Sequence, residues 1–186
     1  MIIGIPSEIK AGEKRVAMSP ANVQSLTDRS VKVLIQADAG SAAGYPDAEY
    51  SAAGATITAD RAEIFASADI ILQVQSFGSN NENSDDDLAR LRSGQLIIGM
   101  MDPLASPQAA QAVADRGATA IALELVPRIS RAQSMDVLSS MATLAGYKAV
   151  LMGASAAPRI FPMLMTAAGT LQPARVLIMG VGVAGL

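Results

Sequence analysis

Three closely spaced glycines follow an apolar segment in the last part of the sequence. Residues 175–179 read Arg-Val-Leu-Ile-Met, and Gly180, Gly182 and Gly185 come next in the spacing G-x-G-x-x-G. After a strand, the first such glycine makes a tight turn, the second lets the backbone approach a pyrophosphate, and the third lets the next helix pack closely. The pattern predicts a dinucleotide-phosphate turn. The alternative is a glycine turn between a strand and a helix that binds no ligand.

A second group of polar residues crowds into one predicted loop. It contains Arg128 and Arg131 together with Gln133 and Asp136. These side chains can donate paired hydrogen bonds to an anion or an amide and can accept them from ribose hydroxyls. Ser134 offers a competing interpretation, in which it is the N-cap of the following helix and Asp136 only complements the helix dipole.

A third group lies in the loop that leaves the first predicted strand, residues 2–5. It contains Glu8, Glu13 and Arg15. Open α/β sheets bind ligands at the carboxyl ends of their strands, so this loop is also a candidate site. A loop closed by its own salt bridges is the alternative.

Histidine and cysteine are both absent from the sequence. The side chain best suited to proton transfer near neutral pH is therefore unavailable, and Ser-His-Asp and thiolate chemistry are excluded within this chain. A zinc site would have to be built from carboxylates alone. We predict no metal site and no catalytic acid or base, so any chemistry must depend on lysine, arginine, carboxylates or positioning.

Short apolar runs alternate with helical patterns along the chain, which predicts an α/β fold with parallel strand pairing. Residues 1–138 are predicted to form one doubly wound, mostly parallel Rossmann-like domain. Residues 139–186 are predicted to begin a second Rossmann domain, incomplete in this sequence, with a linking helix, a first strand at 175–179 and the glycine turn. The expected strands are 2–5, 31–35, 55–57, 70–74, 96–98 and 118–122, and the main helices 20–29, 47–53, 107–115 and 135–156.

Composition narrows the class of protein. The 186 residues are 51% hydrophobic and 17% charged, with a net charge of −3. The negative charge argues against nucleic-acid binding, and the high apolar fraction suggests surface that another part or subunit covers. No uninterrupted apolar run reaches 18 residues, so no membrane span is expected. The run Asp85 to Asp87 is predicted to be a negatively charged first helical turn.

Taken together, these motifs resemble a known family along the whole sequence. The opening GIPSE…RVAMSP, the stretch PRISRAQSMDVLSSMATLAGYKAV and the stretch MTAAGTLQPARVLIMGVGVAGL are similar to the N-terminal part of the NAD(H)-binding α subunit of proton-translocating NAD(P) transhydrogenase. That subunit shares a superfamily with alanine dehydrogenase. The second stretch is the most specific and points to the transhydrogenase branch.

Two departures separate the chain from alanine dehydrogenases. Those enzymes carry a lysine at the end of one strand and a histidine after the next, which handle the substrate carbonyl and its proton. Here Gln75 stands in the place of the lysine, and residues 99–103 contain no histidine. Of the residues that handle the substrate in alanine dehydrogenases, only the arginine is present, as Arg15. Hydride transfer between two nicotinamides needs no protein acid or base, only two rings held close and correctly faced.

The resemblance implies a part of an enzyme that passes hydride between NAD(H) and NADP(H) and couples this to proton translocation, and we expect this part to be inactive alone. The implied partners are an NADP(H)-binding domain, a membrane proton channel and a second copy in a homodimer, at the cytoplasmic face of a membrane. A non-catalytic nucleotide-binding or interaction module of the same fold is the alternative. The expected NAD(H)-binding residues are Arg128, Ile129, Ser130, Arg131, Gln133, Asp136, Ser139, Gly180, Val181, Gly182, Val183, Ala184 and Gly185.

Overall fold

The computed structural model describes residues 1–80 and 84–186. The chain forms two compact units, Met1–Val126 and Pro127–Leu186. The first unit ends before the predicted boundary at 138, because the polar loop that follows Val126 groups with the long helix after it. The two units are described separately below.

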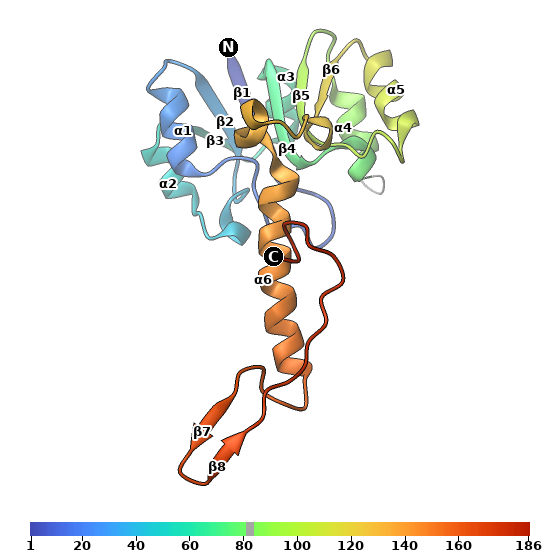
Figure 1. The fold of residues 1–186 in the computed structure, drawn as a ribbon. Coiled ribbons are helices and arrows are strands. Elements are labelled where there is room, and N and C mark those ends of the chain that lie inside the picture. The colour runs from blue at the N-terminus through green and yellow to red at the C-terminus, as the bar shows by residue number, and fades with distance from the viewer. Residues whose placement is uncertain (81–83) are drawn as a thin grey trace. The chain divides into compact units, whose positions relative to one another are not determined.

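The first unit is built on one six-stranded sheet in the order β3-β2-β1-β4-β5-β6 (Figure 1). Every neighbouring pair of strands is parallel. The chain runs outward from β1 to one edge, returns, and then runs from β4 to the other edge, which is the doubly wound order expected from the sequence. The strands are β1 (Ile2–Ile5), β2 (Lys32–Gln36), β3 (Thr56–Thr58), β4 (Ile70–Gln75), β5 (Leu96–Met100) and β6 (Thr119–Ala122).

In the described part of the first unit, five α-helices connect these strands. They are α1 (Pro20–Thr27), α2 (Asp47–Ala52), α3 (Arg61–Ser67), α4 (Asp85–Arg90) and α5 (Pro107–Asp115), with short 3-10 turns η1 (Ser41–Ala43), η2 (Phe77–Ser79) and η3 (Leu123–Leu125). As predicted, Pro20 and Pro107 open their helices, where a missing N–H costs nothing. The predicted acidic turn is the first turn of α4.

Each face of the sheet carries its own hydrophobic core. On one face, Ile71 and Ile97 pack with α3, α4 and α5 through Phe65, Leu91 and Val113. On the other face, side chains of β1 and β2 pack against α1 and α2, with Val23 and Tyr50 fully buried. Aliphatic side chains that alternate along each strand therefore explain the two layers, since successive residues point to opposite faces.

A buried ion pair joins α3 to α4. The guanidinium of Arg61 donates to both carboxylate oxygens of Asp87, at 2.7 and 2.5 Å, and the Asp87 side chain is only 3% exposed. Arg61 also donates to the carbonyl of Ser7, at 2.7 Å, and to Gln36 Oε1, at 3.1 Å. This one arginine thus ties together the carboxyl ends of β1 and β2 and two helices.

We expect Asp87→Ala to destabilise the first unit strongly. Removing one partner of a buried pair leaves the other charge uncompensated, which costs about 3 kcal/mol, or roughly 6–12 °C in Tm. Asp86→Ala is the control, because Asp86 is 89% exposed and lies 3.9 Å from Arg90 in a surface pair. Thermal unfolding of both variants tests this: equal Tm values would show that the Arg61 pair does not hold the unit together.

The second unit consists of a 3-10 segment, η4 (Ser130–Met135), the helix α6 (Val137–Ala156), and a hairpin of β7 (Leu164–Thr166) and β8 (Gly169–Leu171). The strand predicted at 175–179 was wrong for this structure, since residues 172–181 form neither helix nor strand. A parallel strand requires neighbours that accept its hydrogen bonds. Within 127–186 the only strands are β7 and β8, which pair with each other.

The sequence analysis predicted no segment that could span a membrane, but helix α6 passes a test of length and average hydropathy for such a segment. It has 20 residues, and its most apolar window has a mean hydropathy of 1.2, long and apolar enough to cross a bilayer by length and composition alone. The prediction required an uninterrupted run of apolar residues. The mean hydropathy of α6 is high even though the helix contains Lys148 and several glycine, serine and threonine residues.

Candidate cofactor site

The polar loop predicted to bind a nucleotide lies at the start of the second unit. The 3-10 segment η4 is anchored by Ala132, which is 4% exposed. The side chains of Arg128, Arg131 and Gln133 are exposed around it. One small buried residue thus fixes the loop while leaving three hydrogen-bond donors available to a ligand.

Asp136, not Ser134, is the N-cap of α6. Its carboxylate accepts hydrogen bonds from the backbone N–H of Ser139, at 2.9 Å, and from the Ser139 hydroxyl, at 2.6 Å. The competing interpretation of the sequence was therefore wrong about the residue, because Ser134 lies inside η4. These two bonds lower the pKa of Asp136 from its usual value, and the nearby charge of Arg128 contributes further.

We expect Asp136→Ala to lower the Tm of the protein by a few degrees and Ser134→Ala to leave it unchanged, because only Asp136 satisfies a free N–H of the helix. The folded-state pKa of Asp136 is lowered, so its contribution is complete above the unfolded value of about 3.9 and is lost as pH falls through the folded value. Melting curves of the parent and both variants at neutral and acidic pH measure this. A larger effect from Ser134→Ala would restore the original assignment.

The three glycines of the predicted phosphate turn differ in backbone conformation and in the space around them. Gly180 adopts a φ of +111°, which favours glycine, and a Cβ at Gly182 would meet no atom within 4 Å. A Cβ at Gly185 would collide with the carbonyl oxygen of Gly180. The backbone N–H groups of Gly185 and Leu186 donate to the Gly182 carbonyl at 2.9 and 3.1 Å. The first glycine therefore makes the bend, the second leaves an open approach, and the third permits close packing.

Helix α6 carries both predicted elements. A Cβ at Gly146 would collide with the carbonyl oxygen of Ala184, so the glycine turn packs directly on this helix. Gly146 lies two helical turns from Ser139, a rise of about 10 Å. Sequence reasoning missed Gly146, although a glycine in a helix interior is the signal that a backbone approaches closely.

The third group of polar residues forms a network of its own in the first unit. Glu8 accepts hydrogen bonds from the backbone N–H groups of Val74, at 2.6 Å, and Gln75, at 2.9 Å. Glu13 holds the Arg15 guanidinium through two bonds of 2.8 and 2.5 Å, and Gln75 Nε2 donates to Glu13 at 3.2 Å. This arrangement supports the salt-bridged-loop interpretation of that group.

Within this network, Glu13 and Arg15 stabilise each other's charge. The hydrogen bonds from Arg15 lower the pKa of Glu13 to about 2, and Glu13 in turn raises the pKa of Arg15. Burial raises the pKa of Glu8, against the effect of its two backbone donors. Gln75 adds a neutral amide where a lysine would add a second cation.

Two family models match the chain. "Alanine dehydrogenase/PNT, N-terminal domain" matches residues 4–145, and "Alanine dehydrogenase/PNT, C-terminal domain" matches residues 149–186. The chain belongs to the alanine dehydrogenase/PNT family.

Relatives from both branches of the alanine dehydrogenase/PNT family are similar over the full chain. An NAD(P) transhydrogenase alpha-subunit protein of Rhodospirillum rubrum is 46% identical over 186 residues, and alanine dehydrogenase of Halomonas elongata is 35% identical over 188. The crystal structure of transhydrogenase from Sinorhizobium meliloti matches with a TM-score of 0.90 at 43% identity, covering all of this chain and 53% of that one. The chain spans about half (48%) of the length of the two curated relatives.

The family match also bears on α6. The two family domains meet within this helix, because one match ends at residue 145 and the other begins at 149. The boundary between the two family domains therefore lies inside α6.

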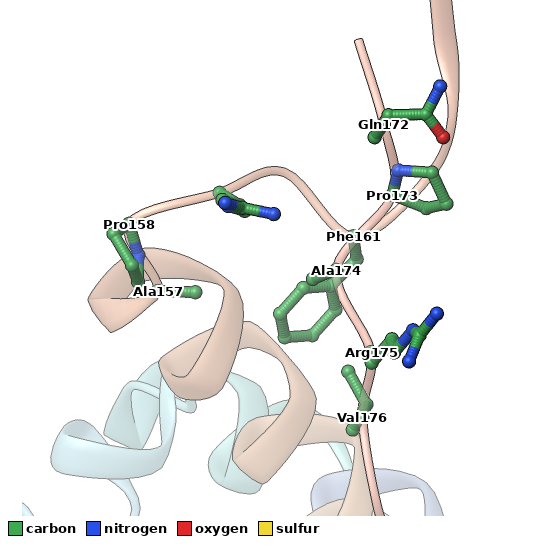
Figure 2. Close-up of a pocket in the computed structure, with 9 residues that line it drawn as sticks. Ala157, Pro158, Phe161, Gln172, Pro173, Ala174, Arg175 and Val176 are labelled. Atoms are coloured by element: carbon green, nitrogen blue, oxygen red, sulfur yellow. The ribbon is translucent and has the colours of Figure 1, made fainter.

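A separate hollow of about 700 Å³ lies in the second unit and contains none of the predicted cofactor residues (Figure 2). It is enclosed by the chain after α6 and the chain after β8, with Phe161 and Arg175 among its lining residues. The residues predicted to bind the cofactor lie elsewhere, on the polar loop and the glycine turn.

Proposed function

We propose that this chain forms the first portion of the NAD(H)-binding component of a proton-translocating NAD(P) transhydrogenase. Support comes from the 46% identity to the Rhodospirillum rubrum protein over the whole chain, against 35% for alanine dehydrogenase of Halomonas elongata. That difference is the single observation that carries the assignment.

The polar loop would orient the nicotinamide end of NAD(H), and the glycine turn would hold its pyrophosphate. Arg128 and Gln133 supply exposed donors for the carboxamide or ribose, while Asp136 and Ser139 fix the start of α6. The open side of Gly182 suits the close approach of backbone to phosphate. Bound NADH supplies the hydride. The role of this chain is to bind the dinucleotide and aim one ring face outward.

The network around Arg15 supports the transhydrogenase branch. Oxidative deamination must move a proton as well as a hydride, and the sequence contains no histidine to move it. Arg15 is engaged by Glu13, and Gln75 cannot supply the positive charge of a lysine. In the same proposal, this component forms a homodimer at the cytoplasmic face of the membrane. It works there with an NADP(H)-binding domain and a membrane proton channel.

Two assays test the proposed activity in the completed polypeptide. By completed polypeptide we mean this chain plus the part of its relatives' length that it does not cover, either fused to it or co-expressed with it. We expect NADH to reduce an NADP analogue in the presence of the NADP(H)-binding domain, and we expect no NADH oxidation that depends on pyruvate and ammonia. Turnover in the second assay at ordinary enzyme rates, with none in the first, would move the chain to the alanine dehydrogenase branch.

A further inference from the structure

Two arginines flank the stem of the β7–β8 hairpin in the second unit. The backbone N–H of Ala174 donates to the carbonyl oxygen of Ile160 at 3.0 Å, which holds together the two segments that lead into and out of the hairpin. Arg159 directly precedes Ile160, and Arg175 directly follows Ala174. Because the hairpin is antiparallel, these two arginines occupy neighbouring positions across the stem, one on each segment.

Both arginines line the hollow of about 700 Å³ in this unit. Figure 2 shows Arg175 on the segment after β8 and Phe161 on the segment after α6. The other residues that line the hollow are uncharged, and among them Gln172 carries a side-chain amide. The wall of the hollow therefore carries two positive charges and no carboxylate.

The second unit has no free carboxylate to balance these charges. Residues 137–186 contain three cations and neither aspartate nor glutamate. Asp136 is the one acid of the second unit, and its carboxylate accepts hydrogen bonds from Ser139 at the start of α6. Within the described part of the chain, neither guanidinium at the stem forms a salt bridge. The charge of the pair is thus uncompensated by the chain itself.

An anion in the hollow would remove this imbalance. Like charges at neighbouring positions across a hairpin repel each other and destabilise it. Guanidinium groups hold phosphate or carboxylate through paired, charge-assisted hydrogen bonds. The volume of the hollow lies within the range of about 300–1,000 Å³ that is usual for small-molecule sites. It therefore has room for an organic group beyond a single phosphate, with Phe161 as an apolar wall.

We propose that the hollow at the hairpin stem is an anion-binding site, in which Arg159 and Arg175 together hold a phosphoryl group. That group belongs either to free inorganic phosphate or to a small phosphorylated molecule. The site is distinct from the proposed NAD(H) site, because none of the predicted cofactor-binding residues lines the hollow. The proposal does not depend on the reaction.

Titration of the completed polypeptide with inorganic phosphate tests the site. Saturating NADH is present throughout, so that the predicted pyrophosphate turn is occupied, and sodium chloride keeps the ionic strength constant. We expect saturable binding of one phosphate per chain. The same titration with AMP distinguishes the sources: AMP that binds at least about tenfold more tightly than phosphate assigns a phosphorylated molecule, and equal affinity assigns the free ion.

Two results of these titrations would overturn the proposal. One is the absence of saturable binding of either probe, as expected if a carboxylate from the rest of the polypeptide fills the hollow. The other is binding that appears only when NADH is left out, because the phosphate would then occupy the NAD(H) site.

Substitution of the arginines locates the binding. Arg159→Gln and Arg175→Gln should each weaken phosphate binding at least about tenfold, because each removes one charged partner. Lys148→Gln is the matched control: it removes the same charge from an exposed position of the second unit that does not line the hollow, and it should bind phosphate within about twofold of the parent. Arginine variants that bind like the parent, or an equal loss in Lys148→Gln, would contradict the assignment.

Thermal unfolding of the same variants provides a second readout. Without phosphate, Arg159→Gln and Arg175→Gln should melt at or above the Tm of the parent, since the repulsion across the stem is relieved. Phosphate should raise the Tm of the parent but not of these variants, because a ligand stabilises only the protein that binds it. An arginine variant that melts well below the parent without phosphate would show that the guanidinium already has a partner, and the proposal would fail.

Discussion

Arg128→Ala and Gln133→Ala are each expected to slow hydride transfer in the completed polypeptide while leaving its Tm unchanged. Both side chains are exposed on the loop before α6 and donate no hydrogen bond to the Asp136 cap. Loss of a charge-assisted hydrogen bond from Arg128 removes about 1.5–3 kcal/mol of stabilisation, which corresponds to a fall of about 10- to 150-fold in rate. Gln133→Ala should have a smaller effect, because a neutral amide makes weaker bonds.

Single-turnover hydride transfer from NADH to an NADP analogue measures these variants, with thermal unfolding alongside. Lys148→Ala is a suitable control, because Lys148 is an exposed residue of α6 that is not among the predicted cofactor-binding residues. If Arg128→Ala transfers hydride at the parent rate, the nicotinamide does not lie on this loop.

Gly185→Ala is expected to weaken NADH binding by more than tenfold. The added Cβ would collide with the carbonyl of Gly180, so the turn must open and lose the shape that would let its backbone approach the pyrophosphate. Gly182→Ala should also weaken binding, but for a different reason: its Cβ meets no protein atom, and would instead occupy the side on which the ligand approaches.

Calorimetric titration with NADH, combined with thermal unfolding, separates the two glycine effects. We expect a lower Tm for Gly185→Ala and an unchanged Tm for Gly182→Ala. Met179→Ala is the control, since Met179 is 91% exposed and directly precedes the turn. Parent-like affinity in both glycine variants would support the alternative of a glycine turn without a ligand.

Local patterns in the sequence were sufficient to predict the six strands of the first unit, although they missed helix α3. Aliphatic runs such as residues 70–74 and 96–98 mark strands whatever their neighbours, and Pro20 and Pro107 mark helix starts. The alternation of strands and helices then leaves few topologies other than the doubly wound one. The observed order β3-β2-β1-β4-β5-β6 is a doubly wound one, as predicted.

Features that depend on distant partners were not predictable. The pair of Arg61 and Asp87 joins residues 26 positions apart, and no periodicity reveals it. The run 175–179 has the composition of a buried strand, yet within 127–186 it has no strand beside it. Ser134 and Asp136 are both good N-cap residues, and only the position of the helix start decides between them.

Hydrogen exchange of the completed polypeptide with and without NADH tests the central claim most directly. Two segments of the second unit, residues 128–139 and 180–185, are proposed to hold the dinucleotide. We predict that NADH slows amide exchange in both segments, while the amides around Glu8, Arg15 and Gln75 exchange as before. Protection of that first-unit network instead, or no protection in either segment, would contradict the account.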